Sequence, residues 1–100
     1  MKRPCVYMLA SGKNGTLYLG VTSDLSGRLE EHENRLSPKS FTARYGVTRL
    51  VWWEPFDTMA DAITREKTMK GWPRAWKLNV IEADNPDWLD MCPETGALYR

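Results

Sequence analysis

Two short apolar runs near the start of the chain, joined by a turn, most restrict the folds open to it. Residues 5–10 and 16–21 are apolar on both alternating faces, as in strands that are covered on both sides. Between them lies Ser-Gly-Lys-Asn-Gly, a composition typical of a tight turn. The sequence therefore predicts an antiparallel hairpin that other parts of the chain must cover from two sides.

The rest of the pattern supplies a third strand and several helices. Residues 48–53 are β-branched and aromatic and end at Glu54-Pro55, which predicts a strand. Helices are predicted where a capping residue precedes apolar residues spaced by three and four. Such segments follow Thr22-Ser23-Asp24, Thr58 and Pro73, with a shorter helical piece at residues 40–45, and Asn85-Pro86 predicts a short turn after the last helix. We expect an α/β (α+β) domain with a small three-stranded, mostly antiparallel sheet flanked by helices, in the order β-β-α-α-β-α-α.

Composition limits the class of protein further. A chain of 100 residues with 42% apolar content suits one small domain. Its apolar runs are shorter than the ~18 residues of a membrane span, and the N-terminus is not typical of a signal peptide. Cys5 and Cys92 are expected to be unpaired thiols. These features predict a cytoplasmic protein without a membrane partner.

Charge is uneven along the chain. The net charge of +1 combines a basic body over residues 1–79 with an acidic segment over residues 80–100. A basic body permits a phosphate-rich partner without requiring one.

Two polar residues occupy positions where apolar ones are expected. His32 lies on the apolar stripe of the first helix, four residues after Arg28, and in such a place is more often a hydrogen-bonded core residue. Glu66 lies between Ile63 and Met69 on an apolar face, where a carboxylate must be paired, protonated or metal-bound. A salt bridge to Arg28 or to a lysine is the simplest interpretation.

Tyr7 and Tyr18 lie on the same face of the hairpin in any register in which the residue numbers of each cross-strand pair add up to an odd number. A two-residue turn at Asn14-Gly15 would leave the two rings about 13 Å apart along the strand. A four-residue loop at residues 11–14 would place them directly opposite each other. Both loop lengths are common, and only the second is expected to assemble a site. Gly20 leaves open space on the same face.

These residues lie in blocks that resemble a known family. VYM and YLG, about ten residues apart, resemble the two halves of the GIY-YIG nuclease signature. The blocks that extend the match are VTSDLSGRLEEH, FTARYG, LVWWEPF, AITREKTMKGWPRAWK and NPDWLDM. The chain is similar to small stand-alone proteins of the GIY-YIG nuclease superfamily, which are related to the nuclease domain of the excinuclease of DNA excision repair. The resemblance implies a nuclease domain at residues 1–91 and a C-terminal tail at residues 92–100.

The resemblance implies a role for each matching residue. Tyr7 and Tyr18 would be the signature tyrosines, Arg28 the essential arginine, His32 its partner one turn later and Glu66 the metal-binding carboxylate. The first half reads Val-Tyr-Met here instead of Gly-Ile-Tyr. The family's late asparagine has no certain equivalent, since Asn79 fits by spacing and Asn85 fits a helix cap better.

The implied chemistry is hydrolysis of a DNA phosphodiester with one Mg²⁺ or Mn²⁺ on Glu66. Arg28 would stabilise charge on the phosphoryl oxygens. We expect Tyr7 to act as the base with help from His32, and Tyr18 to orient water or phosphate; the reverse assignment of the tyrosines stays open. We expect the functional groups of Tyr7, Tyr18, Arg28 and Glu66 to line one cleft with His32 at its edge. A Glu66 side chain on the opposite side of the sheet from Tyr7 would count against this assignment.

Basic side chains would hold the substrate, which we expect to be branched, flapped or damaged DNA from repair or recombination. The candidates are Lys39, Arg44, Arg65, Lys67, Lys70, Arg74 and Lys77, and a solvated surface explains them as well. Trp52, Trp53, Trp72 and Trp88 are expected in the core. A monomer is expected. The alternatives are a non-catalytic nucleic-acid-binding module and a nuclease subunit that a protein partner targets.

Overall fold

The computed structural model describes residues 3–34 and 46–92, and its elements follow the order β-β-α-β-α-α. The strands are β1 (Cys5–Ala10), β2 (Leu17–Thr22) and β3 (Arg49–Pro55). The helices are α1 (Leu25–Asn34), α3 (Met59–Lys70) and α4 (Arg74–Asp84). The predicted α+β class and three-stranded antiparallel sheet are confirmed. The short helix expected at residues 40–45 and the tail after residue 92 lie outside the described residues.

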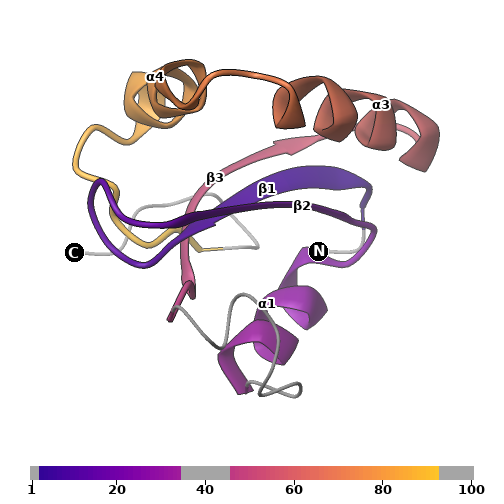
Figure 1. Ribbon diagram of the computed structural model, residues 1–100. Coiled ribbons are helices and arrows are strands. Elements are labelled where there is room, and N and C mark those ends of the chain that lie inside the picture. The colour runs from indigo at the N-terminus through magenta and orange to yellow at the C-terminus, as the bar shows by residue number, and fades with distance from the viewer. Residues whose placement is uncertain (1–2, 35–45, 93–100) are drawn as a thin grey trace.

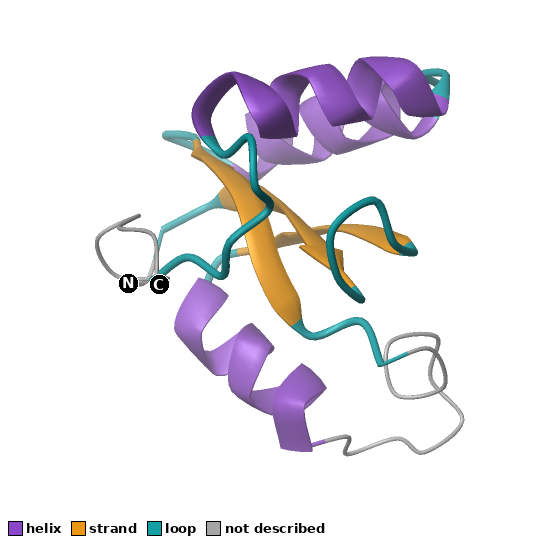
Figure 2. Cartoon of the chain, turned by 90° about the vertical axis from the view of Figure 1, so that its left-hand side faces the viewer, coloured by secondary structure: helices purple, strands orange, loops and turns teal. Residues whose placement is uncertain are grey.

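The described part of the chain forms three layers. The strand order is β2-β1-β3, with α1 on one face of the sheet and with α3 and α4 side by side on the other (Figures 1 and 2). The hairpin is thus covered from both sides, as its apolar pattern predicts. Since β2 is an edge strand, groups from both helical layers can approach it.

The central strand β1 is the core of the molecule, because all six of its residues are fully buried. Its side chains alternate between two apolar clusters. Val6, Met8 and Ala10 pack toward α3 and α4. Cys5, Tyr7 and Leu9 pack toward α1. The expectation of cover on both faces holds fully for β1 and partly for β2, which is half-buried over most of its length.

A bulge in β3 distributes its apolar run between the two faces. Met8 pairs with Trp52 and Leu9 with Leu50, which leaves Val51 as the extra residue. Both Val51 and Trp52 therefore join the α3 and α4 cluster, while Leu50 belongs to the α1 cluster. A bulge re-aims side chains in this way, and simple alternation does not predict it.

The helices on the second face begin and end largely where their capping residues predict. The Thr58 side chain accepts a hydrogen bond from the backbone N–H of Asp61, and Gly71 caps the end of α3. Pro73 precedes the first residue of α4. Of the residues expected on the inner face of α3, Ile63 is partly exposed, whereas Met69 is fully buried.

Asn85 ends α4 and joins it to the sheet. Its Nδ2 donates to the carbonyls of Val51 and Leu89, at 3.1 and 2.8 Å, and its Oδ1 accepts from the Leu89 N–H. The side chain is buried with its hydrogen bonds made. Asn85 is therefore a structural cap, in agreement with the sequence-based interpretation, and the short turn predicted after it is present.

The tryptophans expected in the core pack there to different depths. Trp52 and Trp88 are buried, and Trp53 and Trp72 are half-buried against the two clusters. Neither Cys5 nor Cys92 forms a disulfide bond, as predicted. Within the described residues, no helix is both long and apolar enough to span a membrane.

Candidate active site

The two signature tyrosines meet on the α1 face of the sheet. Tyr7 lies on β1 opposite Gly20, and Tyr18 lies on β2 opposite Leu9, so the two tyrosines are diagonal neighbours. Their ring centroids are 6.2 Å apart, with ring planes tilted by 43°. Tyr7 is fully buried, and Tyr18 is half-buried. The shared face is as predicted, but both expected registers are wrong, because the strands pair from Ala10 and Leu17 outward around a longer loop.

Gly20 makes the contact between the two rings sterically feasible. A Cβ at this position would lie 2.6 Å from both Cζ and Oη of Tyr7 and 2.9 Å from Cε2 of Tyr18. Ordinary carbon contacts are about 3.5–4.0 Å long. The absence of a side chain at Gly20 therefore leaves the space that the two phenols occupy.

Arg28 reaches the tyrosines from the first turns of α1. That helix begins directly after β2 because Thr22 Oγ1 accepts from the Asp24 N–H and Asp24 Oδ1 accepts from the Gly27 N–H. The Arg28 guanidinium hydrogen-bonds the hydroxyls of Tyr7 and Tyr18. It also pairs with Glu31 at 3.1 Å on the solvent side. Three of the predicted site residues thus form one hydrogen-bonded cluster, which we name the Tyr–Arg cluster.

The electrostatics of this cluster bear on which phenol can act as a base. Burial raises the pKa of Tyr7 well above its ordinary value, and the hydrogen bond from Arg28 offsets this only in part. The bond to Tyr7 in turn raises the pKa of Arg28. At neutral pH Tyr7 is therefore a neutral hydrogen-bonding phenol beside a fixed positive charge. This state does not favour the expected role of Tyr7 as the base.

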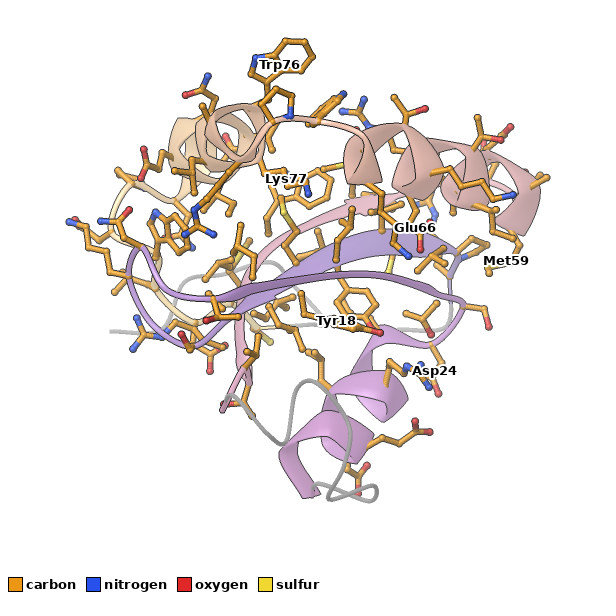
Figure 3. The ribbon with its side chains drawn as sticks, in the orientation of Figure 1. Tyr18, Asp24, Met59, Glu66, Trp76 and Lys77 are labelled. Carbon is orange, nitrogen blue, oxygen red and sulfur yellow. The ribbon has the colours of Figure 1, made fainter. Side chains whose placement is uncertain are left out.

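Glu66 approaches the sheet from the other side. It lies on α3, which packs against β1 and β2 on the face opposite α1. Its side chain is 12% exposed, and Oε2 lies 2.9 Å from the Lys70 ammonium. This confirms the predicted salt bridge to a lysine. Figure 3 shows Glu66 between α3 and the sheet, and Tyr18 on the α1 side.

The structure therefore divides the predicted cleft between the two faces of the sheet. Tyr7, Tyr18 and Arg28 come together, and Glu66 lies across β2 from them. Because β2 is the edge strand, a ligand lying along that edge would have one group on each side. This placement counts against a single cleft on one face, and the assignment of Glu66 to the same site stays a prediction that depends on this edge.

Glu66 fits a single hydrated divalent ion better than a closed protein cage. The described residues contain no group of three or more His, Cys, Asp or Glu side chains that could hold a metal. Mg²⁺ commonly binds one or two carboxylates and keeps several waters, with substrate phosphates as further ligands. A nearly enclosed carboxylate with one lysine partner is compatible with such a site, provided that the lysine can leave.

The other predicted residues fall into three groups. The His32 side chain, Lys39 and Arg44 lie outside the described part. Asn79 is exposed on α4, and Asn85 is buried as a cap, so neither belongs to the Tyr–Arg cluster.

Three of the predicted DNA-binding cations are engaged within the protein. Arg65 pairs with Glu54 at 3.1 Å and lies 5.0 Å from the centroid of Trp72. Arg74 donates to the carbonyls of the hairpin loop, at 3.2 and 2.7 Å. Lys70 holds Glu66. These contacts occupy the three cations within the protein, and of the described candidates Lys67 and Lys77 are left to meet a substrate.

One tryptophan lies on the surface of the protein. Trp76, which is not among the tryptophans expected in the core, is 55% exposed and projects away from α4 (Figure 3). Its ring packs edge-to-face on Trp72 at 6.0 Å. Periodicity places Trp76 on a helix but cannot say how far α4 tilts it out of the core. An exposed tryptophan is a stacking surface for an unpaired base.

Comparison with known proteins supports the assignment of these residues to a family. The GIY-YIG catalytic domain matches residues 3–79, a range that includes the Tyr–Arg cluster and Glu66. A UPF0213 protein of Staphylococcus saprophyticus is 38% identical over 69 residues, 69% of this chain and 83% of that protein. UPF0213 proteins of Staphylococcus aureus strains Mu3 and USA300 are 33% identical, with the same coverage. No solved structure matches the chain significantly. The chain therefore belongs to the GIY-YIG family, as its signature residues imply.

Proposed function

We propose that this protein is a metal-dependent endonuclease that hydrolyses DNA phosphodiester bonds at branched, flapped or damaged structures. The observation that carries the proposal is the Tyr–Arg cluster, in which one guanidinium bonds two phenols on a rigid, fully buried strand and its neighbour. Phosphodiester hydrolysis needs positive charge at the phosphoryl oxygens and a group that handles the proton of the attacking water. The cluster combines both kinds of group within hydrogen-bonding distance.

In the proposed reaction the scissile phosphate lies along the β2 edge. Arg28 would exchange its exposed contact with Glu31 for a phosphoryl oxygen and stabilise the charge that develops there. Tyr7 would hold the guanidinium from the buried side. A divalent ion on Glu66 would supply Lewis-acid stabilisation of the phosphate and the leaving oxygen.

We assign the attacking water to Tyr18 in preference to Tyr7. Tyr18 is the half-exposed phenol, whereas Tyr7 is fully buried and burial raises its pKa. A base must reach the proton that it removes. This assignment takes the alternative that the sequence leaves open.

A second candidate function is a nucleic-acid-binding module with a weak or inactive centre. Two observations favour it: Glu66 lies across the sheet from the Tyr–Arg cluster, and its charge is already balanced by Lys70. Targeting by a protein partner would fit the small number of uncommitted cations among the described residues.

The test is cleavage of labelled single-stranded, duplex, flap and four-way DNA, with matched RNA strands, in Mg²⁺, Mn²⁺ or EDTA. We expect metal-dependent cutting that is strongest on one branched substrate. The Arg28→Ala variant should be slower by about 10²-fold or more, the usual cost of removing one charge-stabilising donor. Glu31→Ala removes the exposed partner of Arg28 and is the control that should still cut. Binding without cutting on every substrate would favour the second candidate.

A further inference from the structure

The Glu66–Lys70 pair combines a nearly enclosed acid with an exposed base. Lys70 Nζ lies 2.9 Å from Glu66 Oε2, one helical turn later on α3. The acid is 12% exposed and the lysine is 58% exposed. The other ion pair of α3, between Glu54 and Arg65, has 40% and 32% exposure, so its partners do not differ in this way.

This asymmetry decides which partner can move. A carboxylate away from water needs a counter-charge, and the Glu66 backbone is fixed in the middle of α3. Lys70 carries its ammonium on a flexible four-carbon stem and has solvent beside it. Lys70 can therefore leave the pair more easily than Glu66 can.

A divalent ion on Glu66 would meet the charge of Lys70. Mg²⁺ binds carboxylate oxygens at about 2.0–2.1 Å, so an ammonium bonded to the same carboxylate would lie within a few ångströms of the metal. Screening by water is weak around a carboxylate this enclosed. The ion and the ammonium thus compete for the same two oxygens.

We propose that Lys70 is the resident counter-ion of Glu66 and sets the affinity of the metal site by competing with the ion. In the metal-free protein its ammonium neutralises the carboxylate; when a divalent ion binds, Lys70 withdraws into solvent. The inference rests on the proposed function, because it takes Glu66 as the metal ligand. Lys70 is a positioning residue here, and its effect is on metal binding before any substrate arrives.

The experiment is a Mn²⁺ titration of the full chain without nucleic acid, followed by the electron paramagnetic resonance signal of free Mn²⁺. Lys70→Gln should lower the Kd for Mn²⁺ by about five- to tenfold, since the competing charge is gone. Lys70→Arg keeps the charge and should stay within about twofold of the wild type. Lys67→Gln removes the same charge from a neighbouring position that does not face Glu66, and should also stay within about twofold.

Two results would overturn the inference. One is a Kd for Mn²⁺ in Lys70→Gln that is unchanged or higher than in the wild type. The other is a decrease in Kd in Lys67→Gln as large as that in Lys70→Gln, which would indicate a general effect of net charge. Glu66→Gln separates this failure from that of the proposed function. If Glu66→Gln still binds one Mn²⁺ with wild-type affinity, Glu66 is not the ligand and the proposed metal site is wrong. If Glu66→Gln loses binding while Lys70→Gln changes nothing, only the role of Lys70 is wrong.

Discussion

Replacing Gly20 with alanine should destabilise the protein and disturb the Tyr–Arg cluster together. The new Cβ would lie 2.6 Å from Cζ and Oη of Tyr7 and 2.9 Å from Cε2 of Tyr18. Contacts must relax to about 3.5 Å, so the Tyr7 ring has to retreat by roughly 1 Å. Tyr7 is fully buried between β1 and α1, and therefore cannot swing into solvent.

The expected cost is about 1–3 kcal/mol, the usual range for inserting a methyl group into a packed core. Alanine in place of glycine normally stabilises a strand by roughly 0.5–1 kcal/mol. The sign of the change in the free energy of unfolding therefore distinguishes a steric clash from this ordinary effect. For a domain of this size the loss corresponds to a decrease in Tm of roughly 4–24 °C.

The assay is urea and thermal unfolding of Gly20→Ala beside Gly12→Ala. Gly12 lies in the hairpin loop, and a Cβ there meets nothing within 4 Å, so its variant should be as stable as the wild type or slightly more stable. Tyr7→Leu shortens the obstructing side chain and should recover part of the loss when combined with Gly20→Ala. A Gly20→Ala protein as stable as the wild type, or simple additivity with Tyr7→Leu, would refute the argument.

Three further outcomes follow from the described contacts. Asn85→Ala removes hydrogen bonds to the Val51 and Leu89 backbones and should lower the free energy of unfolding by about 2–4 kcal/mol; a loss under about 0.5 kcal/mol in urea unfolding would contradict this. Burial raises the pKa of the Cys5 thiol from 9.0 to about 11. The thiol therefore loses its proton at a lower pH in the unfolded chain than in the folded protein. Its contribution to the free energy of unfolding is complete below about pH 9 and should fall by about 2–3 kcal/mol as the pH rises to about 11. Urea titrations at several pH values should show a smaller fall in Cys5→Ala. Trp76→Ala removes the edge-to-face contact with Trp72 and should lower the free energy of unfolding by no more than about 1.5 kcal/mol. It should also weaken binding of single-stranded DNA by about fivefold or more, and unchanged anisotropy titrations would exclude the stacking role.

The parts of the fold that could be predicted are those that local chemistry controls. The Thr58 cap and the all-apolar β1 strand both appear as their residues indicate. The shared face of Tyr7 and Tyr18 also follows from the two-residue period of a strand. The hairpin register could not be predicted, because several loop lengths suit the turn residues.

The features that could not be predicted depend on contacts between residues far apart in the sequence. The bulge at Val51 depends on how β3 fits both layers. The engagement of Arg74 with the hairpin loop joins residues 59 and 60 positions apart. The placement of Glu66 across the sheet follows from the side on which α3 packs, which the spacing of Glu66 on its own helix does not specify. The link between the Tyr–Arg cluster and Glu66 therefore remains a prediction.

That link is the central claim, and single-turnover cleavage by Glu66→Gln tests it most directly. The measurement uses the best-cut DNA in Mg²⁺, with DNA affinity measured in parallel. Glu54→Gln is the matched control, because Glu54 is another partly buried carboxylate in an ion pair, with Arg65. We predict that Glu66→Gln loses about 10²-fold or more in rate with its DNA affinity unchanged, while Glu54→Gln still cuts. A Glu66→Gln enzyme that cuts at the wild-type rate would contradict an active centre shared across the β2 edge.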